Sequence, residues 1–147
     1  MREEDLKRFF LGELDAERLA AEAACSISRI DEIETSIAIE DMDRDFTVTR
    51  DHMRQLLTAA LAGKLNEAEL NAIAFTLIAS DRFEFNEDEV VIEVLHDWSA
   101  PEINYPINNV TLEMHRSWLD GINALPARQP LSKSKGIVVS RRWKRSI

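Results

Sequence analysis

Apolar residues recur at helical spacing along most of the chain, and this pattern alone predicts five or six helices. Two helix pairs are expected in the first 80 residues. In the first pair, Gly12 is placed to end the leading helix, and Asp15 is placed to cap the following one. The apolar positions of that second helix extend to Ile27. The chain therefore begins with a predicted helix–turn–helix unit.

The second pair repeats this design. Thr49 is the expected cap of a helix ending at Gly63, and Asn66 with Glu69 resembles a capping box for the next helix. The corner at Gly12 and the corner at Gly63 match at an offset of 51 residues. Either an internal duplication or two independent uses of one corner design explains the match. The second explanation is favoured because this helix–turn–helix sequence pattern is common in unrelated proteins.

The segment between the two pairs alternates polar and apolar residues instead. Ile37 and Ile39 form one alternating pair, and Phe46 and Val48 form another. Such alternation predicts a short β-hairpin or an extended loop over residues 34–48.

Two further helices are expected in the last third of the helical region. Asn86 is a candidate cap for a helix that carries Trp98 inward and stops before Pro101. Asn109 is a candidate cap for a final helix ending at Gly121. The predicted fold class is mainly α: a single compact domain of five or six helices, a short hairpin and a basic C-terminal tail.

The charge distribution divides the chain into two parts. Residues 1–127 contain all 27 acidic residues and 11 of the 18 basic ones, which gives a net charge of −16. Residues 128–147 contain seven basic residues and no acidic one. We therefore expect an acidic helical domain over 1–127 and a basic tail over 128–147, in which residues 137–139 form either an added edge strand or a clamped tail end.

The composition also narrows the setting. Four glycines and four prolines are few for an all-β fold. The single cysteine, Cys25, excludes an intramolecular disulfide, suits a reducing cytoplasm and is expected to be a small buried side chain. No apolar run approaches the roughly 20 residues of a membrane helix, so we expect no membrane association.

The chain lacks the sequence signatures of the common catalytic and metal sites. Starting at Asp41, a calcium loop would place Phe46 at its glycine position and His52 at its bidentate position, and neither residue suits. The three histidines lack the spacing of a helical zinc site, although a site that joins His96 or His115 to distant carboxylates stays an alternative. No catalytic residue, metal or cofactor is predicted.

The sequence of the tail resembles a nucleic-acid contact. Basic residues flank one aromatic residue there, which suits phosphate binding and base stacking. The acidic body would repel a polyanion, so self-neutralisation and simple solvation are favoured alternatives. The residues concerned are Arg141, Arg142, Trp143, Lys144 and Arg145.

One resemblance suggests a function. Residues 61–66, 78–85 and especially 98–107, with the segment Pro-Glu-Ile-Asn-Tyr-Pro, resemble small acidic bacterial proteins of the immunity type over about residues 56–119. The resemblance implies a protein that accompanies a toxin and blocks it. Its motifs are structural, so no functional residue carries over from the family.

An acidic inhibitor would be steered toward the basic cleft of a nuclease toxin. The first candidate contacts lie between the two helix pairs and are Glu40, Asp41, Asp43 and Asp45. The second candidates are Glu84, Glu87, Asp88 and Glu89, for which helix N-terminal charge is the alternative explanation. The favoured prediction is a cytoplasmic protein-binding module. A small enzyme with a His–carboxylate site and a structural partner that contacts nucleic acid through its tail are the alternatives.

Overall fold

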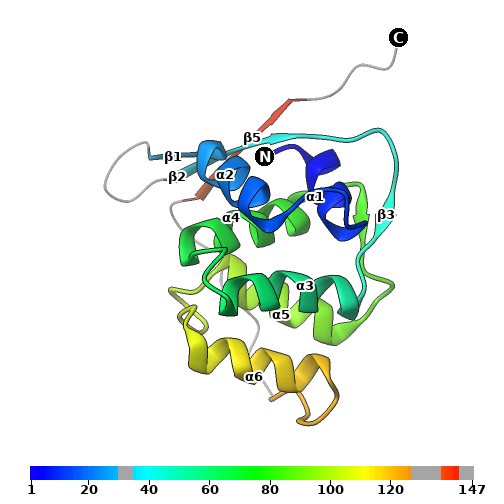
Figure 1. The fold of residues 1–147 in the computed structure, drawn as a ribbon, viewed down its shortest axis with the longest axis vertical. Helices are drawn as coiled ribbons and strands as arrows, with labels where there is room; N and C mark the ends of the chain where they lie inside the picture. Colours follow the sequence, from blue (N-terminus) through cyan, green and yellow to red (C-terminus); the bar gives the residue numbers. More distant parts are fainter. Residues whose placement is uncertain (30–34, 127–136, 143–147) are drawn as a thin grey trace.

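The computed structural model describes residues 1–29, 35–126 and 137–142, and within these ranges helices dominate (Figure 1). The predicted mainly α, single-domain fold is confirmed. The helices are α1 (Glu3–Phe10), α2 (Ala16–Ser26), α3 (Arg50–Leu61), α4 (Glu67–Ala79), α5 (Glu89–Ser99) and α6 (Asn109–Leu119). The strands are β1 (Ile27–Arg29), β2 (Thr35–Glu40), β3 (Phe46–Thr47), β4 (Phe83–Glu84) and β5 (Ile137–Arg142).

Helix α4 lies at the centre of the fold because its sequence is apolar on nearly every side. It packs against α2 and α5, and it also contacts α1, α3 and β2. Leu70, Ile73 and Leu77 are fully buried in the main core. Ala72 faces a smaller cluster formed with Ile37 and other residues under β2. One helix thus joins the helical layers to the sheet.

The predicted corners of the two helix pairs, and the caps predicted at Asp15, Thr49 and Asn66, are confirmed. Gly12 and Gly63 have φ angles of +79° and +77°, a conformation that side-chain-bearing residues rarely adopt. Asp15 accepts a hydrogen bond from a first-turn backbone N–H of α2, while Thr49 and Asn66 form capping boxes at α3 and α4. The start of each of these helices was therefore readable from local sequence.

A short antiparallel hairpin is present as predicted, but its strands are β1 and β2, so the hairpin alternative for residues 34–48 is wrong in its pairing. Ile37 and Ile39 lie in β2, which pairs antiparallel with β1, whereas Phe46 lies in β3, which pairs parallel with β4. The first strand of the observed hairpin begins at Ile27, so α2 ends one residue earlier than its apolar pattern suggested. Strand partners distant in sequence leave no local signal, which explains the error.

The predicted edge strand near residues 137–139 is confirmed, because β5 lies parallel to β2 at the edge of the sheet with order β1-β2-β5. In this register Arg141 lies opposite Ile39, and Arg142 lies opposite Glu40. The backbone at Arg141 and Arg142 therefore runs beside the strand that leads into the first acidic segment.

Three local predictions need correction. Asp88, not Asn86, caps α5, and Asn108, not Asn109, caps α6. Cys25 is exposed rather than buried. The buried face of α2 includes Ala23, and a residue two positions further along a helix points in a different direction.

Candidate functional site

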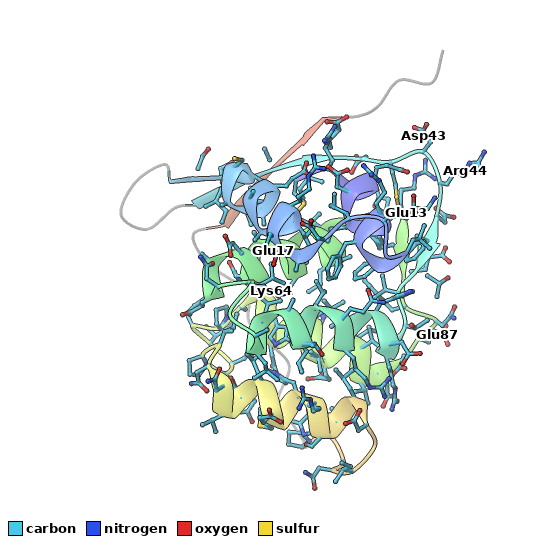
Figure 2. The ribbon with its side chains drawn as sticks, viewed as in Figure 1. Glu13, Glu17, Asp43, Arg44, Lys64 and Glu87 are labelled. Carbon is cyan, nitrogen blue, oxygen red and sulfur yellow. The ribbon has the colours of Figure 1, made fainter. Side chains whose placement is uncertain are left out.

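The two predicted acidic segments are brought to one side of the molecule by a two-residue parallel ladder. Strand β3 directly follows the first segment, and β4 contains Glu84, the first residue of the second segment, which lies opposite Thr47. Figure 2 shows Asp43 and Glu87 projecting from this same side. We call the exposed carboxylates here the acidic edge; its members are Asp43, Asp45, Glu84, Glu87 and Glu89.

Aromatic packing holds the ladder in place. The Phe83 side chain is buried at 4% exposure, and its ring meets the ring of Phe46 edge to face at 6.2 Å. The Phe10 ring stacks on Phe46 at 6.0 Å and also contacts His52 at 4.9 Å. Because α1 and α3 supply these last two rings, the position of the acidic edge depends on the core.

Most carboxylates of the acidic edge have no cation beside them. Asp45 lies 3.4 Å from Arg82 in an exposed pair, and the neighbouring Arg44 is itself exposed. Within the described part of the chain, Asp43, Glu84 and Glu87 form no ion pair. The edge therefore presents excess negative charge to solvent.

Asp88 differs from its neighbours because its carboxylate already binds groups within the protein. It caps α5, and Arg50 Nε donates to its carboxylate at 2.8 Å. That hydrogen bond, together with the backbone N–H groups of the helix start, holds the pKa of Asp88 below its ordinary value. Asp88 therefore acts mainly as a structural anchor between α3 and α5.

The turn before Asp88 has an unusual backbone. Asn86 and Glu87 have φ angles of 50° and 57°, a left-handed conformation that costs a non-glycine residue about 1–2 kcal/mol. The turn exposes both side chains. Such strain concentrates at functional positions, so Glu87 is the strongest contact candidate in the second segment.

The prediction that Asp41 is a surface contact is wrong, because its side chain is buried, with 2% of the residue exposed. It lies beside Glu3, which is fully buried and accepts a hydrogen bond from the Met42 backbone N–H at 3.2 Å. The pKa of Glu3 is raised to about 7, mainly by burial and also by the Asp41 carboxyl, against opposing hydrogen bonds from Ser80 and the Met42 backbone.

The remaining acidic candidate and the tail residues lie at the sheet. Glu40 is half-buried at the end of β2, opposite Arg142 in the backbone register. Arg141 and Arg142 belong to β5, whereas Trp143, Lys144 and Arg145 lie outside the described residues. The described part of the tail is therefore a strand beside the acidic domain.

One histidine does meet a carboxylate, as the enzyme alternative requires. His115 Nε2 lies 2.9 Å from Asp97 Oδ2, and Trp98 Nε1 donates to His115 Nδ1 at 3.1 Å. Because an indole nitrogen only donates, Nδ1 must accept, and the proton of the neutral ring sits on Nε2. The side chains of His115 and Asp97 are 1% and 0% exposed, so a substrate cannot reach them from the surface. This triad joins α5 to α6 inside the core.

The other two histidines show no catalytic pairing among the residues that the structure places. His52 Nδ1 accepts from the Thr49 backbone N–H at 3.0 Å, and burial lowers the pKa of His52. His96 contributes its backbone carbonyl, which accepts from Asn104. Over the described ranges, no group of three or more His, Cys, Asp or Glu side chains is arranged to hold a metal ion.

No helix that the structure describes is long and apolar enough to cross a membrane.

Sequence reasoning missed the buried polar contacts. The sequence places Glu3 in the first turn of a helix, where an acidic residue is usually exposed. Its burial depends on the segment at Asp41, which is distant in sequence and packs beside it. For the hydrogen bond between His115 and Trp98, the only sequence signal was that both residues lie on the inward faces of their helices.

No protein-family model matches the chain, and neither a curated protein nor a solved structure matches it.

Proposed function

We propose that this chain is a non-catalytic binding protein of the immunity type, which blocks the basic active-site cleft of a toxin with its acidic edge. The observation that supports this proposal is the β3–β4 ladder, which joins two acidic segments separated by 38 residues into one surface. Its carboxylates are exposed and mostly free of cations in the described residues.

The physical basis is electrostatic steering. Several unpaired carboxylates on one edge, on a domain with a large negative charge, attract a basic protein and orient it before contact. Asp43 and Glu87 lie on the two segments and project outward, so a basic cleft can reach both (Figure 2). Carboxylates at this edge would occupy the positions that nucleic-acid phosphates take in a nuclease.

The proposed function is tested by capture. The full chain is immobilised and exposed to cytoplasmic extract from its native cells, supplemented with secreted proteins, at about 50 mM and about 300 mM salt. We expect a basic protein to bind stoichiometrically at low salt and to weaken at high salt, because salt screens exposed charges. The purified partner should lose its own activity when the chain is added. A captured protein that is acidic, or that stays fully active when bound, would contradict the proposal.

A further inference from the structure

A groove of about 480 Å³ lies between α3 and the corner that joins α1 to α2. Helix α3 supplies one wall with residues three and four positions apart, so a single helix face runs along the groove over about 16 Å. Apolar groups of Phe9, Leu14, Ala59 and Ala62 line it. Figure 2 shows Glu17 and Lys64 near one end, between α2 and α3.

The charged side chains that line this groove are Asp15, Asp51, Arg54 and Lys64, which balance one another, and the excess negative charge comes from acidic residues beside them. Its two cations are already paired, since Arg54 Nε contacts Asp120 at 2.7 Å and Lys64 contacts Glu17 at 3.6 Å. Glu13, by contrast, is exposed with no ion pair in the described ranges.

The groove continues toward the acidic edge. A second, polar pocket of about 390 Å³ shares Asp51 and Arg54 with it and reaches Asn86 and Asp88. The strained turn that presents Glu87 therefore lies at the far end of this second pocket. An apolar depression with a negative rim thus connects to the carboxylates of the edge.

We propose that the groove receives an aliphatic or aromatic side chain of a basic protein partner, whose neighbouring lysine or arginine side chains contact the acidic edge. This inference rests on the proposed function and adds the apolar anchor that charge alone does not supply. Protein interfaces commonly combine such a buried apolar centre with a polar rim. The negative rim selects a basic partner over an acidic one for the same groove.

The test uses two synthetic peptides and the full chain. One peptide is acetyl-Lys-Arg-Leu-Trp-Leu-Arg-Lys-amide, and its matched control replaces the three apolar residues with serine. Binding is followed by amide chemical shifts in ¹⁵N-labelled protein at low salt. We expect the apolar peptide to bind at least tenfold more tightly and to shift the amides of Thr58, Ala59 and Ala62.

Variants separate the groove from the edge. Ala62→Phe fills the groove from an exposed position, whereas Ala68→Phe adds the same bulk to the exposed surface of α4, away from the lining residues. We expect at least fivefold weaker binding of the apolar peptide for Ala62→Phe and less than twofold for Ala68→Phe. Thermal unfolding of both variants verifies that they are folded.

Equal binding of the two peptides, or chemical-shift changes confined to residues 43–45 and 84–87, would overturn the inference about the groove. Neither result would contradict the proposed role of the acidic edge. The absence of binding by the apolar peptide at 1 mM would also overturn the inference. The capture of a basic protein from extract tests the proposed function separately.

Discussion

Phe46 and Phe83 lie opposite one another in the parallel ladder between β3 and β4, with their rings edge to face. This contact joins the end of the first acidic segment to the start of the second. Two backbone hydrogen bonds lie beside this contact. Phe46 N–H donates to the Arg82 carbonyl at 2.8 Å, and Val48 N–H donates to the Glu84 carbonyl at 2.7 Å. The acidic edge therefore depends on a few core contacts.

Removing the Phe83 ring should weaken the ladder and the whole domain. Phe83→Ala is expected to lower the free energy of unfolding by about 3–5 kcal/mol, because the side chain is buried. The amides of Phe46 and Val48 should also exchange faster in hydrogen-exchange measurements. Phe83→Leu, which keeps most of the volume, should cost less than about 1.5 kcal/mol. Equal losses for the two variants in urea unfolding would contradict this role for the ring.

The Glu3 carboxyl should make stability depend on pH. Its pKa in the folded state is raised to about 7, so the folded protein holds a proton that the unfolded chain has lost between about pH 4.5 and 7. Stability is then fully present below pH 4.5 and declines by up to about 3 kcal/mol as the pH rises to 7.

Substitution isolates this contribution. Glu3→Gln cannot ionise, so its unfolding free energy should change less over that pH range, and it should exceed the wild-type value at pH 8. Glu4→Gln is the matched control because Glu4 is exposed on the same helix. Urea unfolding at pH 5 and pH 8 provides the comparison, and a pH profile unaltered by Glu3→Gln would exclude this assignment.

The triad inside the core should contribute stability rather than activity. His115→Leu removes the acceptor of the Trp98 indole and a hydrogen bond to the Asp97 carboxyl, at an expected cost of about 3 kcal/mol. Trp98→Ala should cost roughly 3–5 kcal/mol. His96→Leu changes a half-buried side chain and should lower the free energy of unfolding by less than about 1 kcal/mol. Scanning calorimetry of the three variants measures these losses. A loss for His115→Leu as small as that for His96→Leu would refute the structural role.

The turn at Glu87 offers a variant that separates stability from binding. Glu87→Gly relieves a φ of 57° and should raise stability by up to about 1 kcal/mol, whereas Glu89→Gly, at the first residue of α5, relieves no such strain and should not raise it. Glu87→Gly should nevertheless weaken partner binding, because it removes an exposed carboxylate. A stabilised variant with undiminished binding would exclude Glu87 as a contact.

The helical part of this fold was largely predictable from local sequence. The corner at Gly12 has the same hydrogen bonds as the corner at Gly63, and a third such corner follows α6 at Gly121. This third example lies 58 residues after the second, which breaks the offset of 51. A glycine stop thus also occurs outside the repeat, as a general way to end a helix predicts.

The pairing of strands was not predictable in the same way. Phe46 meets Phe83 across 36 intervening positions, and β5 joins β2 from the far end of the chain. Such contacts depend on where α4 and α5 place the strands, and no local pattern encodes that placement.

The candidate site was predicted only in part. Asp43 and Glu87 are exposed as a contact requires, but Asp41, which belongs to the same acidic run, is buried against Glu3. An acidic run therefore does not reveal which carboxylates face solvent. Asp41→Lys would place a charge in the core, so it tests stability and not binding.

The central claim is that the acidic edge binds a basic protein. The most direct measurement is the affinity of the captured partner for the wild-type chain and for Asp43→Lys with Glu87→Lys, at about 50 and 300 mM salt. Glu67→Lys with Glu113→Lys is the control, because it makes the same change in net charge at exposed positions on α4 and α6. We predict that the edge variant loses at least tenfold in affinity and most of its salt dependence, while the control changes less than threefold. Equal losses for the two double variants would show that net charge alone drives binding, and would contradict a defined acidic edge.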